Sequence, residues 1–396
     1  MKRGSGLSKG WATAVVLTVG LIVAGCSGDG QGSTGGGAAE PQAKNVAVQV
    51  PMAVTMTPAG GAEGVSPAGP FTVAVTDGKL KSVALTNPEG KQVAGALAAD
   101  GTSWLASEPL GFGKTYTWSG TAADHDGKEA PITGSFTTVT PARKISGSFN
   151  VGDDQTYGVA MPVAIEFSAP VTDKASVQKA LKINTSVPTE GAWAWLSDTQ
   201  VHWRPKEYWK PGTVVDVAAP LYGVPHGDGA YGNQDVTVHF TIGRALIATA
   251  DTQTHRFVVT KDGQQIFDFP ASYGLEDDPG RVTKSGIHVV ISKSTEVSMT
   301  NERYNYRDIK VPWGVQISYN GEYVHGYEGS RAQQGNTNVS HGCANLAPEN
   351  AEQYYNEVIP GDPVNVTGST IPLSEADRTY YDWSLDWSAW VAKSAV

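Results

Sequence analysis

The sequence predicts a mostly β protein, in which two similar β-sandwiches precede a β-rich third domain with one main helix and a Trp-rich C-terminal extension. Two observations favour this fold class. From about Val46 onward, short runs of alternating apolar and polar residues are separated by turn sequences such as "TDGK" and "NPEG". A pattern of Trp, a further aromatic residue and a Gly-led strand also occurs twice, about one sandwich apart.

The first 25 residues have the pattern of an export signal. A positively charged start precedes the apolar run "WATAVVLTVGLIVAG", which is too short and too close to the N-terminus for a settled transmembrane helix. The small residues Ala24 and Gly25 stand directly before Cys26, as in a bacterial lipobox. We therefore predict a lipoprotein signal peptide over residues 1–25, with Cys26 as the lipidated first residue of the mature chain. An ordinary secretory signal is the alternative.

Residues 26–45 are rich in glycine and lack large apolar side chains, so we expect a flexible tether. The whole chain has 29 Lys and Arg against 39 Asp and Glu, a formal net charge of −10. Three of the basic residues fall in residues 1–25, which leaves about −13 for the mature chain (26 − 39). This acidic balance argues against nucleic acid as a partner and against a polybasic grip on lipid. Membrane attachment is expected through lipid at Cys26.

The repeat predicts two immunoglobulin-like sandwiches, over residues 46–140 and 141–245. The segments "SWLASEPLGFGKTYTWSG" and "VHWRPKEYWKPGTVVDVAAP" place Trp104 and Trp203 at positions 99 residues apart. A repeat of this length with strand-and-turn texture is typical of tandem immunoglobulin-like domains. Neither copy contains a cluster of residues suited to catalysis, so we interpret both as spacers.

Residues 246–366 are expected to form the third domain. A first hairpin turns at Asp262-Gly263, a favoured two-residue turn, and a second turns around Asn320-Gly321. One convincing helix follows, "PENAEQYYNEVI", with Pro348 near its start. The candidate chemistry of the chain falls within this domain.

The C-terminal extension, residues 367–396, is expected to pack on the third domain. Its residues Trp383, Trp387 and Trp390 recur at i, i+4 and i+7. This spacing is typical of an apolar stripe along a packed helix.

The stretch "NVSHGCANLAP" contains a cysteine without a partner. The chain has two cysteines, and Cys26 cannot form a disulfide once it is acylated. Cys343 is then left alone in an oxidising compartment, where cysteines usually occur as disulfides. An odd cysteine in an exported protein indicates a reactive thiol.

Two histidines are candidates for the base that activates Cys343. A histidine within hydrogen-bond reach would lower the pKa of the thiol by forming an ion pair and would later protonate the leaving amine. His341 lies two residues before the cysteine, about 6–7 Å away along an extended strand, and is poorly placed to reach the sulfur. His325 comes from a separate strand and can face the thiol. We therefore predict His325 as the base.

Gly342 permits a tight backbone path next to the cysteine. That path can direct the amides of Gly342 and Cys343 at a developing oxyanion, where one preorganised donor contributes roughly 3–4 kcal/mol. The prediction is a nucleophile with its oxyanion donors in one turn.

Three other interpretations of Cys343 remain open from the residues alone. The thiol could be a buried structural group, since free cysteine behaves as a small hydrophobe. His325, His341 and Cys343 could bind zinc, although His-x-Cys is not a usual zinc spacing and there is no second cysteine pair, so we predict no metal and no other cofactor. The arrangement could also be intact in a chain that has lost activity.

The segment from His325 to Asn345 reads His, 14 residues, then Ser-His-Gly-Cys-Ala-Asn. It resembles the signature of the L,D-transpeptidase catalytic domain, with every fixed position filled. The layout of lipobox, two immunoglobulin-like domains, catalytic domain and Trp-rich extension is similar to that of the mycobacterial-type members. The resemblance covers nearly the whole mature chain, but only the signature is specific.

The resemblance implies a cysteine-dependent acyltransferase that cross-links peptidoglycan. Cys343 would attack the bond between the third residue, a diamino acid, and the terminal D-Ala of a tetrapeptide stem, with release of D-Ala. The amine of an acceptor stem would resolve the thioester to a 3→3 cross-link. Carbapenems are the expected covalent inhibitors. The expected location is the outer face of the cytoplasmic membrane, held by lipid at Cys26 and reaching into the cell wall.

The resemblance also carries over site residues position by position. His325 matches the catalytic histidine, held by the carbonyl of the residue after it, here Gly326. The supporting positions of the motif correspond to Ser340, His341, Gly342 and Asn345. The remaining matches are Tyr319 near the oxyanion site, Met299 and Tyr304 on a lid over the substrate, and Trp313 lining the cleft. The segment "GYEGSRAQQGNTN" differs from the family pattern, which leaves the substrate contacts there open.

Two other functions are compatible with the same residues. An L,D-carboxypeptidase would form the same acyl-enzyme and release it to water. A non-enzymatic wall-binding lipoprotein would use its sandwiches and leave the thiol idle.

Overall fold

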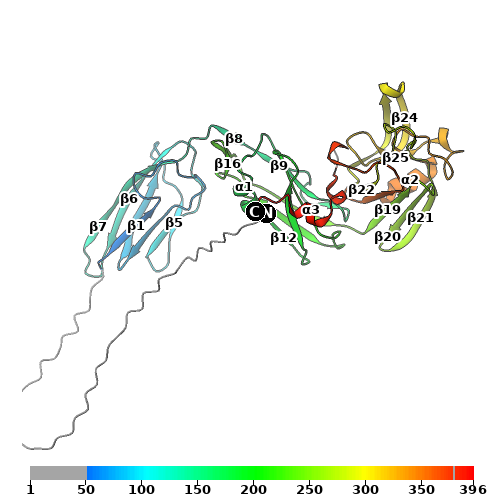
Figure 1. The fold of residues 1–396 in the computed structure, drawn as a ribbon. Helices are drawn as coiled ribbons and strands as arrows, with labels where there is room; N and C mark the ends of the chain where they lie inside the picture. The colour runs from blue at the N-terminus through cyan, green and yellow to red at the C-terminus, as the bar shows by residue number, and fades with distance from the viewer. Residues whose placement is uncertain (1–50, 378–379) are drawn as a thin grey trace, which may run out of the picture. The chain divides into compact units, whose positions relative to one another are not determined.

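The computed structural model describes residues 51–377 and 380–396. The predicted signal peptide, the lipidated Cys26 and the tether lie outside these residues. The mostly β fold predicted from the sequence is confirmed, with strands from residue 53 to residue 367 and only short helices (Figure 1). Among the described residues, no helix is long and apolar enough to cross a membrane.

The first sandwich consists of two antiparallel sheets. One has the strand order β1-β2-β5-β4, with β1 (Ala53–Thr57), β2 (Thr72–Thr76), β5 (Ser103–Ala106) and β4 (Gly95–Leu97). The other has the order β3-β6-β7, with β3 (Lys79–Thr86), β6 (Thr115–Ala123) and β7 (Glu129–Thr137). Its core includes Trp104 and Trp118, whose rings meet edge to face at 5.8 Å.

The second sandwich has a larger core and one short helix, α1 (Lys174–Ala180), which Asp173 caps. One sheet has the order β10-β18-β15-β12, with β10 (Gln155–Tyr157), β18 (Val236–Ile242), β15 (Val214–Ala219) and β12 (Lys182–Thr185). The facing sheet has the order β13-β14-β11-β9, with β13 (Gly191–Trp195), β14 (Gln200–Pro205), β11 (Val163–Phe167) and β9 (Gly147–Phe149). A small sheet adds β16 (Pro225–Gly227), β17 (Ala230–Gly232) and β8 (Arg143–Ile145).

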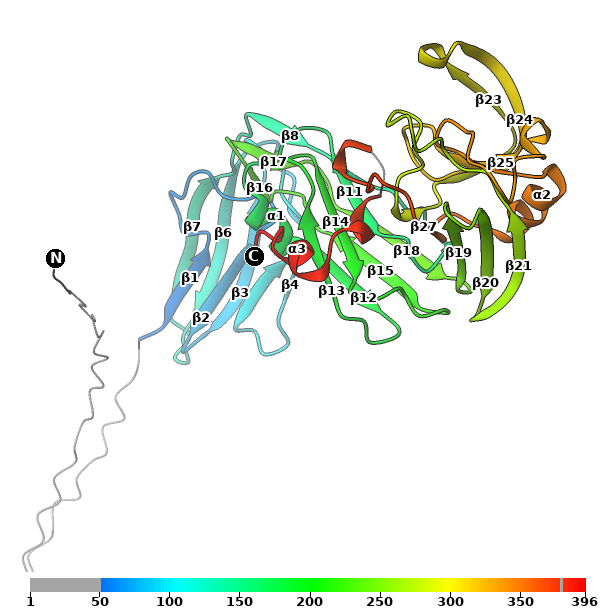
Figure 2. The same cartoon turned by 45° about the vertical axis from the view of Figure 1, so that its right-hand side comes forward.

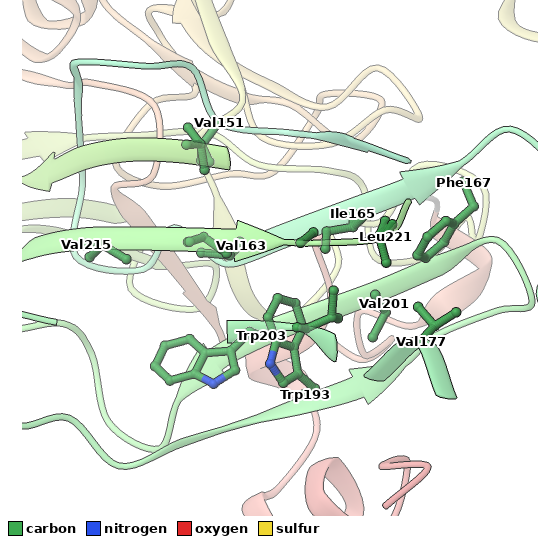
Figure 3. Close-up of a cluster of buried hydrophobic side chains, with 14 of the residues drawn as sticks. Val151, Val163, Ile165, Phe167, Val177, Trp193, Val201, Trp203, Val215 and Leu221 are labelled. Carbon is green, nitrogen blue, oxygen red and sulfur yellow. The ribbon is translucent and has the colours of Figure 1, made fainter. Parts of the chain in front are cut away.

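The repeated tryptophans occupy equivalent sites in the two sandwiches. Trp203 lies in the core of the second sandwich beside Trp193 and Val201 (Figure 3). A Cβ on Gly191 would come within 2.0 Å of the Trp203 ring, and a Cβ on Gly95 within 2.0 Å of the Trp104 ring. Each indole therefore covers a glycine of the neighbouring strand, which explains the repeat in physical terms.

The third domain packs two sheets around a common core. The first has the order β21-β20-β19-β27-β22, with β21 (Gln264–Pro270), β20 (Arg256–Lys261), β19 (Leu246–Asp251), β27 (Pro363–Thr367) and β22 (Gly286–Val289). The second has the order β23-β24-β25-β26, with β23 (Ser292–Asn301), β24 (Tyr306–Gln316), β25 (Tyr323–Gly326) and β26 (Ala344–Leu346). The predicted helix is α2 (Pro348–Glu357).

Two turns of this domain behave differently from one another. Asp262 and Gly263 both have positive φ (50° and 82°), as a two-residue hairpin turn requires. Around Asn320-Gly321 the strands are paired only from Gln316 and Tyr323 outward, so the connection is longer than the sequence suggested. The long β23–β24 hairpin, yellow in Figure 2, was not predicted as such.

The C-terminal extension departs from its predicted position and shape. Residues up to Leu373 pair with the third domain, where the Leu373 amide donates to the Ser285 carbonyl at 2.7 Å. The following part packs on the second sandwich instead, because the Trp390 indole donates to the Ala192 carbonyl at 2.9 Å and Asp382 binds His202 at 2.8 Å.

The tryptophans of the extension also do not form one helical stripe. Trp383 lies in a short 3₁₀ helix (Asp382–Ser384), whereas the other two lie in α3 (Trp387–Val391). Arg204 of β14 unites them: its guanidinium carbon lies 4.7 Å from the Trp383 ring, 5.3 Å from Trp387 and 4.8 Å from Trp390. Cation–π contacts with the second sandwich therefore explain their spacing.

Candidate active site

The parallel pair β25–β26 brings the predicted base and nucleophile to the same place. Its register pairs Val324 with Ala344 and His325 with Asn345. Cys343 directly precedes β26, so the same register puts it level with Tyr323. Side chains two residues apart on a strand share a face, and His325 and Cys343 accordingly line one cavity.

Ser340 fixes the turn that carries the cysteine. Its hydroxyl donates to the Cys343 carbonyl at 2.6 Å and accepts from the Gly342 amide at 3.2 Å. Gly342 has φ +117°, a conformation that other residues rarely adopt. Thr283 completes the support by donating to the Gly342 carbonyl at 2.9 Å.

This network corrects one sequence-based expectation about the oxyanion site. Because the Gly342 amide is bonded to Ser340, it is not free to bind an oxyanion. The Cys343 amide has no hydrogen-bond acceptor within residues 51–377 and 380–396. The donor available at this turn is therefore the amide of the cysteine alone.

The Cys343 side chain is a free, partly buried thiol. Its sulfur lies 3.7 Å from the Gly321 carbonyl. Burial raises the pKa of the Cys343 thiol to about 12, although a hydrogen bond from the Tyr323 amide works in the opposite direction. The thiol is thus protonated at neutral pH.

His325 is held in one tautomer. Its Nδ1 lies 3.0 Å from the Gly326 carbonyl, which can only accept, so Nδ1 carries the proton and Nε2 keeps a free lone pair. Burial lowers the pKa of His325 to about 4, and the bond to Gly326 opposes this shift. Burial thus disfavours both the thiolate and the imidazolium and opposes the ion pair expected from the sequence. The histidine is arranged as a base.

A cavity of about 460 Å³ surrounds these two side chains. Several residues singled out in the sequence line it: Met299, Tyr304, His325, Ser340, His341, Cys343 and Asn345. The buried Asn345 donates to the Ser330 hydroxyl at 3.3 Å, while its Oδ1 has no hydrogen-bond partner among the described residues. This oxygen is an unpaired acceptor buried in the wall of the cavity.

The β23–β24 hairpin supplies an aromatic wall. The His341 ring lies 4.7 Å from the Tyr304 ring and 5.1 Å from the Tyr306 ring, between centroids. Burial raises the pKa of Tyr306, and the charge of a Cys343 thiolate would raise it further. Tyr306 also lines the cavity that contains the thiol. His341 thus packs against the aromatic rings of this hairpin, where the sequence predicted a lid.

Two predicted substrate contacts lie elsewhere. Tyr319 is 57% exposed and borders a different cavity, with its ring 6.3 Å from Tyr380 of the extension. Trp313 packs on Tyr355 at 5.3 Å, next to the core of the domain, and does not line the Cys343 cavity. Tyr306, unlike Tyr319, lines the cavity that contains the thiol.

Sequence reasoning missed half of the cavity wall. The additional residues are Tyr306, Ile309, Val311, Tyr327, Gly329, Ser330, Gln333 and Val339. Strand alternation would have suggested part of this set, but Asp308 has φ +53° and the register shifts between Met299 and Asn301. These irregularities redirect the side chains of β24 and hide the simple pattern.

Among residues 51–377 and 380–396, no three His, Cys, Asp or Glu side chains are grouped as a metal site would require. Only His341 and His325 accompany the thiol in the cavity as nitrogen donors, and His341 is engaged with the lid aromatics. The geometry accordingly supplies no set of ligands for zinc.

Comparisons with known proteins agree with the motif. Residues 246–366 match the model of the L,D-transpeptidase catalytic domain, and residues 62–225 match a bacterial Ig domain. L,D-transpeptidase 5 of Mycobacterium tuberculosis (strain ATCC 25618 / H37Rv) is 50% identical over 347 residues, which cover 87% of this chain and 77% of that protein. L,D-transpeptidase 2 of strain CDC 1551 / Oshkosh is 37% identical over 398 residues, covering 98% of this chain and 96% of that one.

A solved structure of L,D-transpeptidase 3 from Mycobacterium tuberculosis, in complex with a faropenem-derived adduct, is 30% identical, with a TM-score of 0.46 and coverage of 56% of this chain and 97% of that one. The two longer sequence matches span most of both proteins. On that basis, the chain belongs to the L,D-transpeptidase family.

Proposed function

We propose that this family member forms 3→3 peptidoglycan cross-links through a thioester on Cys343. The observation that carries the proposal is the tautomer of His325. Its Nδ1 is committed to the Gly326 carbonyl, so Nε2 is the acceptor available in the cavity that it shares with the thiol. Acyl transfer needs a base that can take the proton of the nucleophile, and His325 Nε2 is available for this in the cavity that contains Cys343.

The first half-reaction acylates the enzyme. His325 Nε2 takes the thiol proton while the Cys343 sulfur attacks the carbonyl of the diamino acid in a donor tetrapeptide. Because burial disfavours both the thiolate and the imidazolium, the proton moves during the attack rather than before it. The Cys343 amide binds the oxyanion. The imidazolium then protonates the D-Ala nitrogen, the C–N bond breaks and D-Ala leaves.

The second half-reaction resolves the thioester. The side-chain amine of an acceptor stem attacks the carbonyl, His325 accepts a proton from that amine, and the C–S bond breaks. The sulfur regains the proton and the cross-linked product leaves. Ser340 keeps the turn in place throughout, since its hydroxyl bonds both the Gly342 amide and the Cys343 carbonyl.

The proposal includes inhibition by β-lactams of the carbapenem and penem type, which would acylate Cys343. It also includes lipid attachment at Cys26 and a position at the outer face of the cytoplasmic membrane. A variant Cys26→Ala that remained in the membrane fraction after carbonate washing, with an unmodified N-terminal peptide by mass, would contradict the lipid anchor.

The test of acyl transfer is the intact mass of residues 46–396 after incubation with a tetrapeptide stem. The expected gain is the mass of the stem minus D-Ala, absent in Cys343→Ala and strongly reduced in His325→Gln. His239→Gln is the matched control, because His239 lies on β18 and binds Asp216 far from the thiol in sequence and fold.

The product separates the remaining functions. Adding excess acceptor stem should convert the adduct into a dimer of stems. Tripeptide without dimer would assign an L,D-carboxypeptidase. A folded protein with a titratable thiol, but without adduct or D-Ala release, would favour the wall-binding lipoprotein.

A further inference from the structure

A buried carboxyl group lies behind the turn that carries the nucleophile. Glu322 directly precedes β25 and is 8% exposed. Its Oε1 faces the Lys284 amide at 3.5 Å, and its Oε2 has no hydrogen-bond partner among the described residues. A Cβ on Gly342 would lie 3.6 Å from Oε1. The carboxyl group therefore touches the turn on the side away from Ser340 without being neutralised by a direct ion pair.

A buried histidine faces the same carboxyl group. His288 of β22 is fully buried, with Nε2 at 2.8 Å from the Lys284 carbonyl and Nδ1 at 3.3 Å from the Ile317 carbonyl. The same two segments hold Glu322, because the Lys284 amide faces its carboxyl group and the Ile317 amide donates to its backbone carbonyl at 3.0 Å.

A second acid approaches from the C-terminal extension. Asp377 is 7% exposed and accepts hydrogen bonds from Ser374, at 2.8 Å and 3.0 Å, and from Asn320 at 3.4 Å. The titratable groups around Glu322 are thus His288, Asp377 and the thiol of Cys343. Those around the thiol are Glu322, Tyr306 and Tyr323, with His325 across the cavity.

These groups influence one another. Burial raises the pKa of Glu322, His288 opposes this rise and Asp377 adds to it. Burial also raises the pKa of Cys343, and the Glu322 carboxylate contributes to that rise. A carboxylate on Glu322, next to the turn, would therefore disfavour a thiolate on Cys343.

We propose that Glu322 is a positioning residue that keeps Cys343 protonated in the free enzyme. The thiol then ionises only when an acyl group is placed between it and His325. The inference rests on the proposed role of Cys343 as nucleophile. It also accounts for the survival of one free thiol in an oxidising compartment, because the thiolate is the form that reacts with oxidants.

The test is the rate of alkylation by iodoacetamide between pH 6 and pH 10 in the chain from residue 46 to residue 396. Glu322→Gln preserves the shape and removes the charge. Because the thiol titrates above this range, its midpoint is compared through the displacement of the plot of log rate against pH. For Glu322→Gln we expect a displacement to lower pH by at least half a unit, so that alkylation at pH 7.5 is at least about threefold faster. Inactivation by hydrogen peroxide should accelerate by a similar factor.

Three companion variants make the result specific. Glu322→Asp restores the charge and should return the midpoint towards that of the parent. Glu276→Gln removes an acid that binds Thr370 in the same domain and should leave the midpoint unchanged. Glu322→Met, neutral and of similar length, replaces the Gln variant if that one does not fold.

An unchanged midpoint in a folded neutral variant overturns the inference, whatever the turnover. Alkylation needs no substrate, so its outcome is independent of the acyl-transfer test. Normal D-Ala release together with an unchanged midpoint in the neutral variant would contradict the role of Glu322 and leave the proposed function intact. A shifted midpoint without any D-Ala release would instead remove the proposed function.

Discussion

His325 and Asn345 are register partners on the neighbouring parallel strands β25 and β26. This pairing places the imidazole two strand positions beyond the level of Cys343, on the face that lines the cavity. The 14 residues between His325 and Ser340 form a connection that brings the chain back beside β25, where β26 pairs with it in parallel. The geometry of base and nucleophile is therefore set by one parallel strand pair.

The first prediction concerns the acid limb of the pH profile. Burial lowers the pKa of His325 to about 4, so its base form persists well below the usual range of histidine. We expect kcat/KM for a tetrapeptide donor to stay nearly constant from pH 7 to about pH 5 and to fall as the pH passes through about 4. A fall centred near pH 6.5 would show that His325 is not desolvated in the free enzyme.

The second prediction concerns Ser340. Replacing it with Ala removes the bonds to Gly342 and Cys343, and we expect acylation by faropenem to slow by roughly 10- to 100-fold, since small misplacement of a nucleophile has effects of this size. Single-turnover mass spectrometry measures it. Ser340→Thr should restore most of the rate, and Ser292→Ala, on the exposed strand β23, should have none of the effect. An acylation rate in Ser340→Ala equal to that of the parent would show that the hydrogen bonds of Ser340 do not position the nucleophile.

The third prediction concerns the lid. Tyr304 stacks on His341 at 4.7 Å, a contact of about 0.5–1.5 kcal/mol in aromatic pairs. Tyr304→Ala should therefore raise KM for the donor stem by about 2- to 10-fold, with a smaller change in kcat. Tyr319→Ala is the matched control, because that side chain is exposed and borders another cavity. Equal effects of the two variants would contradict the position of the lid.

The fourth prediction concerns the docking of the C-terminal extension. Trp390 is fully buried and its indole binds the Ala192 carbonyl. Trp390→Ala should lower the free energy of unfolding of the second sandwich by about 3–5 kcal/mol. Urea denaturation followed by circular dichroism measures this value. Trp387→Ala removes a partly exposed ring and should be milder; a reversed order would show that α3 does not anchor the extension.

Local patterns predicted much of the fold. Alternation in the strands, the Asp262-Gly263 turn and the start of α2 at Pro348 are determined by neighbouring residues, and they match the structure. The motif likewise identified five of the residues that line the cavity, because their spacing in sequence is fixed by one loop and one strand pair; they are His325, Ser340, His341, Cys343 and Asn345.

Features that depend on distant partners were not predictable in this way. Tryptophans at helical spacing show that one face of a segment is apolar, but they do not show against which surface that face packs. Here they pack on the guanidinium of Arg204, which is far away in sequence. Tyr306 reaches the thiol through the backbone irregularity at Asp308. Glu322 reads as an ordinary turn residue until the fold buries it beneath Gly342.

The return of the extension has a topological consequence. The chain leaves the second sandwich after β18, traces the whole catalytic domain, and comes back to β13 and β14 through Trp390 and Arg204. The catalytic domain is thus inserted into the second sandwich and connected to it by two segments, residues 243–245 and the C-terminal extension. Cleavage of the 243–245 connection alone would not release it, because the extension still binds the second sandwich through Trp390 and Arg204.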